Sequence, residues 1–286
     1  MLDEQGRHSL YFESYLEAVK YSERIPLEQL TEAAAGPSPD YFDHGATMDE
    51  AMVMARAGHY PPDLPSLKLS KRQCRTRSDI AMVFDTHGPC VDVAAALCGV
   101  PEAFFRLEEE RLFAPSFDSV EIVYNSAVSH TVSVDTMRAR GLLATTLAHV
   151  CETSGLPTRL IWTDVCDWCG GSPASDGSKG MHCVIQIKDY SDPLDMPAVG
   201  FWYGHPAAPR RLGFRIAEVT YPSAGAWGFG APRNAYSSGC GDRTKQIVLN
   251  HGLASAHLSS PEKAIKQAIK VLISENVITR ESGDEY

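Results

Sequence analysis

Residues 120–163, VEIVYNSAVSHTVSVDTMRARGLLATTLAHVCETSGLPTRLIWT, decide the fold. Val120–Tyr124 is a short apolar run rich in β-branched residues, which predicts a strand. Arg159–Thr163 predicts a second strand of the same kind. Between them, Leu142–Glu152 has the apolar spacing of one helix face, with apolar residues at Leu143, Leu147, Val150 and Cys151. A strand, a helix and a strand so close together predict a parallel βαβ unit with a right-handed crossover.

The C-terminal sequence continues this alternation of strands and helices. Further strands are predicted at His182–Lys188, Phe214–Val219 and Ile247–Leu249. A final helix is predicted after Ser260 and Pro261, an N-cap residue followed by proline at the first helical position. Residues 116–286 are therefore expected to form an α/β domain of the Rossmann type, a mostly parallel sheet with helices on both faces.

Residues 1–115 are expected to form a smaller helical and irregular region. Thr47 and Glu50 have the spacing of a capping box, so a helix is predicted at Met48–Ala57. A short strand is predicted at Ile80–Phe84 and a short helical segment at Asp92–Gly99. We place the boundary between the two regions near residue 116.

Composition and charge narrow the classes of function. The chain has 286 residues, with 26 Lys and Arg against 36 Asp and Glu, a formal net charge of -10. This balance argues against nucleic-acid wrapping or membrane attachment by bulk electrostatics. We find no secretory signal and no apolar run of the roughly 18 residues that a membrane span needs, so a cytoplasmic protein is expected. In that compartment the 8 cysteines are expected to be free thiols or metal ligands rather than disulfides.

One group of residues has the composition of a zinc site. Cys166 and Cys169 are separated by two residues, and His182 and Cys183 are adjacent. Thiolate and imidazole ligands in such pairs hold tetrahedral zinc. Adjacent residues of a regular strand point to opposite faces, however, which argues against joint ligation by His182 and Cys183. Buried or loop thiols are the alternative.

A second candidate site follows the strand at Val120–Tyr124. Asn125, Ser126 and Ser129 lie just past its end, where α/β sheets place their ligand crevice. Their oxygen atoms are hard donors of the kind that Mg²⁺ prefers. A polar loop between strand and helix is the alternative.

The remaining chemistry-bearing residues define two weaker candidates. A basic strip at residues 68–77 could contact phosphate or simply be solvated, and its candidate nucleic-acid ligands are Lys71, Arg72, Arg75 and Arg77. Asp85 and His87 could pair as carboxylate and imidazole, but the sequence has no Gly-x-Ser-x-Gly nucleophile elbow. The sequence therefore favours a non-enzymatic protein.

Most of the chain resembles a known family. Residues 122–164 (IVYNSAVSHTVSVDTMRARGLLATTLAHVCETSGLPTRLIWTD) resemble the opening of a von Willebrand factor A-like domain. Residues 189–218 and 260–277 resemble the later part of tailed-phage proteins of that kind, and residues 43–59 and 91–105 resemble their N-terminal parts. The resemblance implies an interaction module. Domains of this kind often act as partners of ring-forming ATPases.

The same resemblance bears on metal binding. The family's metal-ion-dependent adhesion site uses Asp-x-Ser-x-Ser after the first strand. Here the Asp position falls on Tyr124 or on Asn125, so the carboxylate is missing. Loss of a negative ligand argues against Mg²⁺ and leaves Asn125, Ser126 and Ser129 as a vestigial ligand loop.

Two functions from different classes follow. The first is a non-enzymatic cytoplasmic adaptor, acting in the host cytoplasm if phage-encoded, with a protein partner such as an AAA-type ATPase. The second is a nucleic-acid-binding accessory protein that uses the basic strip, together with a structural zinc site.

Overall fold

The computed structural model describes residues 2–31, 44–60, 78–85, 90–100, 103–111, 118–129, 131–168, 177–221, 230–235, 244–250, 261–275 and 277. Below, the term described residues refers to these ranges. Side chains of residues 78–85, 90, 94, 105–111, 261, 262 and 265 are outside the description.

A six-stranded mixed sheet forms the centre of the molecule, with strand order β1-β7-β6-β5-β9 and with β8 paired to β6. Parallel pairing joins β1 to β7, β5 to β6 and β5 to β9, whereas β7 and β8 are antiparallel to β6. The predicted α/β class with a mostly parallel sheet is confirmed. The strands are β1 (Arg7–Phe12), β5 (Ser119–Asn125), β6 (Thr158–Asp167), β7 (Gly180–Lys188), β8 (Ala231–Pro232) and β9 (Thr244–Leu249).

The predicted βαβ unit is present as β5, α5 (Val134–Thr153) and β6. The helix begins eight residues before the predicted start because Ser133 caps it, its side chain accepting a hydrogen bond from the amide of Thr136. Buried apolar side chains of α5 pack on the sheet, among them Leu143 and Leu147.

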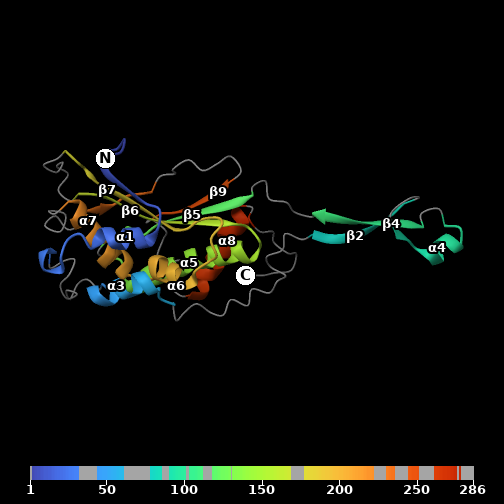
Figure 1. Ribbon diagram of the computed structural model, residues 1–286, viewed down its shortest axis with the longest axis horizontal. Coiled ribbons are helices and arrows are strands. Elements are labelled where there is room, and N and C mark those ends of the chain that lie inside the picture. The colour runs from blue at the N-terminus through green and yellow to red at the C-terminus, as the bar shows by residue number, and fades with distance from the viewer. Residues whose placement is uncertain are drawn as a thin grey trace.

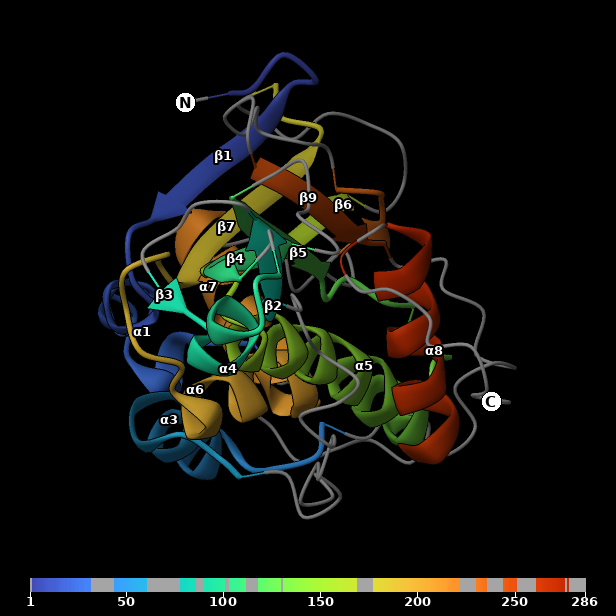
Figure 2. The ribbon, with the colours of Figure 1, turned by 90° about the vertical axis from the view of Figure 1, so that its right-hand side faces the viewer.

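The described helices of the main body lie on one face of the sheet (Figures 1 and 2). They are α1 (Tyr15–Ser22), α3 (Met48–Ala57), α5, α6 (Met196–Val199), α7 (Phe214–Thr220) and α8 (Pro261–Ser274). The main core lies between these helices and the sheet. The opposite face carries a smaller apolar cluster around Val123, Ile161 and Val165. In the described residues, the layering is therefore one-sided rather than the two-sided arrangement expected from the sequence.

Two π-helical segments, η2 (Gly200–Gly204) and η3 (Ala208–Gly213), connect α6 to α7. Gly141 of α5 lies directly against η2, because a Cβ atom there would come 2.2 Å from the backbone oxygen of Tyr203. The aromatic run before η3, comprising Phe201, Trp202 and Tyr203, is at most 2% exposed. These aromatic residues belong to the core rather than to an interface.

The N-terminal elements are part of the same body, which corrects the predicted boundary near residue 116. β1 forms the edge of the sheet beside β7, with Arg7 opposite Gly180 and Phe12 opposite Ile185. Helices α1 and α3 contribute buried residues to the main core. The predicted capping box of α3 is present, since Thr47 and Glu50 exchange backbone-to-side-chain hydrogen bonds. Strand β1 was missed because its partner lies more than 160 residues later in the chain.

Residues 214–219 form a helix, not the predicted strand. Phe214–Thr220 is α7, and it continues directly from η3. Arg215, Ile216, Ala217 and Glu218 are all buried. A short stretch with several apolar residues does not by itself distinguish a strand from a helix, and packing against α1 on the helical side of the sheet determines the structure.

A second, three-stranded sheet stands apart from the first. It has the order β2-β4-β3 and is antiparallel, with β2 (Ser78–Asp85), β3 (Cys90–Val91) and β4 (Phe104–Arg111). The short helix α4 (Val93–Leu97) lies between β3 and β4, and Asp92 accepts a hydrogen bond from the amide of Ala95 at 3.1 Å. Figure 1 shows this sheet and α4 as an arm beside the main body, with α4 near its far end.

Candidate binding surfaces

The polar residues at the end of β5 are occupied with backbone hydrogen bonds. Asn125 donates from Nδ2 to the oxygen of Arg233 at 2.7 Å and accepts from the amide of Ala127 at 3.2 Å. Ser126 donates from Oγ to the oxygen of Thr163 at 3.1 Å. Asn125 and Ser126 are at most 2% exposed. These side chains fasten β5 to its neighbours instead of presenting oxygen ligands.

Ser129, the third residue of the predicted ligand loop, lies further out. Its Oγ accepts hydrogen bonds from the amide and the hydroxyl of Thr131, the latter at 3.1 Å. The structure therefore does not join Ser129 with Asn125 and Ser126 in one set of open oxygen ligands. This placement leaves the prediction of a vestigial loop intact and adds nothing in favour of Mg²⁺.

A buried arginine that the sequence analysis did not single out lies at the same end of the sheet. Arg140 of α5 is 2% exposed, and its Nη2 donates to the backbone oxygen of Asn125 at 2.8 Å and of Asn250 at 3.4 Å. Its guanidinium carbon lies 5.6 Å from the centre of the Tyr124 ring. Among the described residues no carboxylate pairs with Arg140, and its Nε has no hydrogen-bond acceptor. Within the described part of the chain, the end of β5 thus holds a positive charge without a counter-ion.

A buried carboxyl group lies one strand away. Asp164 of β6 is 8% exposed, and burial raises the pKa of this group from 3.8 to about 7. In the described part of the chain its carboxyl forms no hydrogen bond or ion pair. A Cβ atom at Gly213 of η3 would come 2.9 Å from Oδ2 of Asp164, so this carboxyl lies directly against η3. Groups with perturbed pKa values and no structural partner are candidates for function.

The proposed zinc ligands do not all come together. Cys166 and Cys183 are buried on the helical side of the sheet, whereas His182 lies on the other side, where its Nδ1 is 4.0 Å from Asp3. Cys169 is outside the described residues. Burial, with a smaller contribution from Asp164, raises the pKa of both thiols well above the ordinary value. No group of three or more His, Cys, Asp or Glu that could hold a metal occurs among the described residues.

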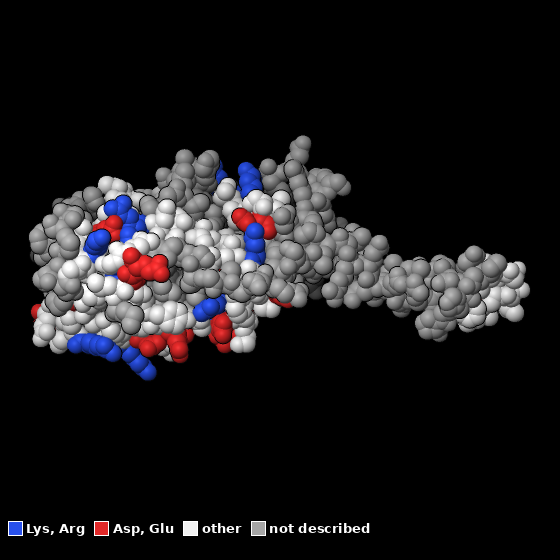
Figure 3. Space-filling view, turned by 90° about the horizontal axis from the view of Figure 1, so that it is seen from above, with Lys and Arg blue, Asp and Glu red and all other residues white. Residues whose placement is uncertain are grey.

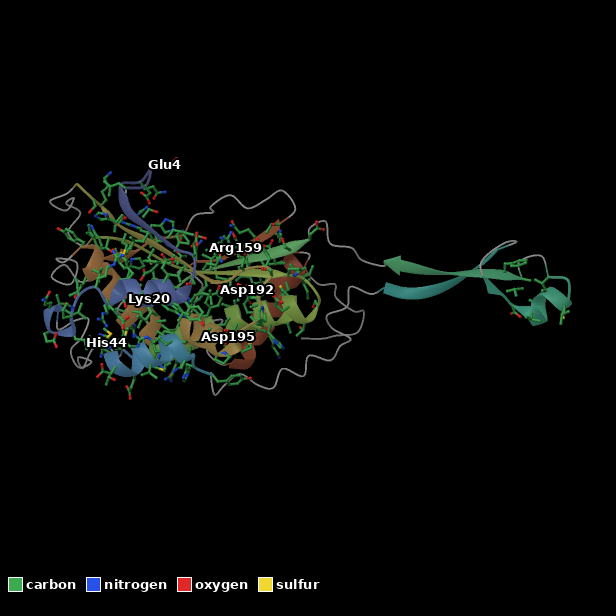
Figure 4. All side chains as sticks on the ribbon, in the orientation of Figure 1. Glu4, Lys20, His44, Arg159, Asp192 and Asp195 are labelled. Carbon is green, nitrogen blue, oxygen red and sulfur yellow. The ribbon has the colours of Figure 1, made fainter. Side chains whose placement is uncertain are left out.

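Charged side chains on the strand side of the sheet are paired. Arg159 donates to Gln186 at 2.8 Å and to the Tyr11 hydroxyl at 3.0 Å, and its Nη1 is 3.4 Å from Glu121. Glu121 also accepts from Gln246 at 2.6 Å. Figure 4 shows Arg159 on this side, and Figure 3 shows positive and negative side chains interspersed there. This face does not present a single field of charge.

The arm carries exposed apolar side chains. Of the eleven large hydrophobic residues that are exposed in the described chain, five lie between residues 91 and 104. This cluster, the arm tip, comprises Val91 (43%), Val93 (61%), Leu97 (84%), Val100 (44%) and Phe104 (36%). Asp92 is the single acidic or basic residue of segment 90–100, and it caps α4. Such a concentration of exposed apolar surface on a folded protein indicates a binding surface.

Other predicted residues lie beyond the described ranges. Lys71, Arg72, Arg75, Arg77 and His87 belong to this group, so nucleic-acid contact by the basic strip and the pairing of Asp85 with His87 stay predictions. Across the described residues, no helix is both long enough and apolar enough to cross a membrane.

The fold and these surfaces define an α/β protein with a one-sided helical layer and a separate apolar arm. The sequence model of a family described as domain of unknown function DUF7192 matches residues 6–274, and the chain belongs to this family. The match begins one residue before β1 and ends at the last residue of α8, so it spans the arm and both ends of the body. Comparison with curated proteins and with solved structures found no match.

Proposed function

We propose that the protein is a cytoplasmic adaptor that binds another protein through the arm tip. The supporting observation is the exposure of Val93 and Leu97, 61% and 84%, on a short helix in a segment whose single charged residue is the capping Asp92. Exposing side chains of this kind to water is unfavourable, by about 25 cal/mol for each Å² that a partner could cover. A groove lined by apolar residues on the partner protein fits this chemistry.

Other occupants fit the arm tip less well. Nucleic acid requires Lys or Arg for its phosphates, and segment 90–100 has neither. Membrane-surface helices are longer and carry basic residues on their polar face. A second copy meeting tip to tip would bury far less than the roughly 800 Å² per partner of a stable interface. If the resemblance to von Willebrand factor A-like proteins extends to partners, a ring-forming ATPase is the class to test first.

The experiment is site-specific photo-crosslinking with the full chain. A photoreactive amino acid replaces Leu97 in one variant and Val53 in a control, because Val53 is 62% exposed on α3 and distant in the sequence. We expect one protein to be crosslinked at residue 97 and not at residue 53. Its purified form should then bind the wild type and the Val53→Glu control equally.

Leu97→Glu and Val93→Asp should each weaken this binding by at least about tenfold, the effect of losing an apolar contact in an interface centre. Equal crosslinking at residues 53 and 97 would contradict the proposal. So would binding to lipid vesicles, or crosslinking of the chain only to itself.

A further inference from the structure

We propose that Arg140 is the central residue of an oxyanion-binding site at the carboxyl ends of β5 and β9. The ligand would be a small molecule or group with phosphate or carboxylate oxygens. This site is separate from the arm tip, and it stands whether or not the arm binds a protein.

The first argument concerns charge. A guanidinium buried to 98% normally has a carboxylate partner, because an isolated buried charge is costly. Arg140 instead contacts the two backbone oxygens of Asn125 and Asn250. Backbone oxygens carry only partial charge, so a full negative charge at this position would be strongly stabilised.

The second argument concerns unused donors. A guanidinium has five N–H donors, and both observed hydrogen bonds of Arg140 come from Nη2. Nε is buried and has no acceptor within the described residues. Nη1 also makes no hydrogen bond within the described residues. Unlike Nε, it is not fully buried. An oxyanion that reached Nη1 would gain charge-assisted hydrogen bonds without displacing the existing ones.

The third argument concerns position. The guanidinium lies where β5 and β9, two parallel strands, end together, and this is the edge at which α/β sheets bind ligands. Gly141 fixes α5 against η2, and Arg140 immediately precedes it. The contact with the Tyr124 ring holds the guanidinium further, through a cation–π interaction. The donors are therefore fixed in place before any ligand arrives.

The ligand proposed here is an anion, whereas the sequence analysis considered a cation at the end of β5. The vestigial ligand loop was considered as a position for Mg²⁺, with Asn125 as one ligand. In the structure the backbone oxygen of Asn125 accepts from Arg140, and a cation there would be repelled by the guanidinium.

The first test is an NMR titration of the wild-type protein. The resonance of the Arg140 Nε–H group is followed while phosphate, sulfate or acetate replaces chloride at constant ionic strength, which removes general screening effects. We expect a saturable shift. Saturation with phosphate and sulfate alone identifies phosphate-type ligands, and saturation with acetate as well identifies carboxylates.

Variants then locate the site. In Arg140→Gln, which lacks the guanidinium, anion binding is followed at the backbone amide resonances of Asn125 and Gly141. It should weaken at least about tenfold, the loss of a charge-assisted hydrogen bond. The matched control is Arg138→Gln, on the same helix, because the Arg138 side chain is 51% exposed and its ion pair among the described residues is with Asp135 at 3.7 Å. This control should bind like the wild type. An Arg140 resonance that does not respond to any of the three anions would overturn the proposal, and so would equal loss in both variants.

Discussion

At the amino ends of β5 and β6 the charged side chains are paired, whereas near the carboxyl ends two buried ones of the described residues, Arg140 and Asp164, are not. Asp167, the last residue of β6, does pair with Arg7 at 2.7 Å and with Arg233 at 2.6 Å. Glu121 pairs with Arg159, and Glu152 pairs with Lys188 at 2.8 Å beside the first residue of β6. At the other end, Arg140 and Asp164 are buried and, within the described residues, lack ionic partners. Among the described residues, these two unpaired buried charges therefore lie near the carboxyl ends of the strands, and they reduce stability there.

This difference has a physical meaning. Pairing buried charges offsets the cost of removing them from water, and leaving them unpaired lowers the free energy of unfolding. Proteins keep unpaired buried charges mainly where a ligand, a proton or a partner interacts with the charged group. The contrast therefore points to the carboxyl ends of the strands as the functional end of the sheet.

The largest effect is expected for Asp164→Asn. The folded protein holds this proton up to about pH 7, whereas the unfolded carboxyl releases it near 3.8. Stability should therefore fall as pH rises between these two values, and the loss is complete above the folded pKa. Asp164→Asn replaces the titrating carboxyl by a neutral amide. The variant should therefore be more stable than the wild type by up to about 4 kcal/mol at about pH 8, and by almost nothing near pH 4.

Urea unfolding of wild type and variant at both pH values measures this effect. Asp135→Asn is the matched control, because the Asp135 side chain is 93% exposed. The contrast between the two ends fails if Asp164→Asn is no more stable than the wild type at high pH.

The next effect is at the paired end. The side chain of Lys188 is 2% exposed, and Glu152→Gln would leave its charge buried without a counter-ion. We expect a loss of about 3 kcal/mol in unfolding free energy. Adding Lys188→Met to this variant should recover much of the loss, and a double variant as unstable as the sum of its parts would refute the pairing.

Glu152 should also show the opposite pH dependence to Asp164. Burial alone would raise its pKa, but hydrogen bonds from Lys188 and Thr158 outweigh burial and hold the pKa below the ordinary value. The stability that this pair contributes should thus be present above the unfolded pKa. It should be lost as pH falls through the folded pKa.

The smallest effect is expected for Glu121→Gln. Its partner Arg159 is 28% exposed and 3.4 Å away, so water screens this pair. The amide can still accept from Gln246, and we expect a loss of about 1 kcal/mol in urea unfolding. A loss larger than that of Glu152→Gln would reverse the order predicted here.

Sequence patterns predicted the elements whose structure is determined by residues close together in the chain. The capping box at Thr47 and Glu50 and the βαβ unit are formed by neighbouring residues, and both are present as predicted. The pairing of β1 with β7 and the direction of β7 depend on distant contacts, so periodicity did not reveal them. Phe214–Val219 is too short for its apolar pattern to separate strand from helix, and it is helical in the structure.

The candidate site was only partly predictable. The sequence analysis singled out the end of β5 for its polar residues, but it did not recognise Arg140 and Asp164. Both had a signal in the sequence. Arg140 lies three residues before Leu143 on the apolar stripe of the helix. Asp164 shares its side of the strand with Trp162 and Cys166, two buried residues. In both cases a charged residue occupies a position that faces the core, and this pattern could have identified the two residues from the sequence.

The most direct test of the contrast between the two ends of the sheet is an NMR pH titration that follows the carboxyl carbons of Asp164 and Glu152 in one sample. We predict that Asp164 titrates at about 7 and that Glu152 titrates below its ordinary value. An Asp164 pKa near 3.8 would show that this carboxyl has a stabilising partner after all, and it would contradict the distinction between the two ends.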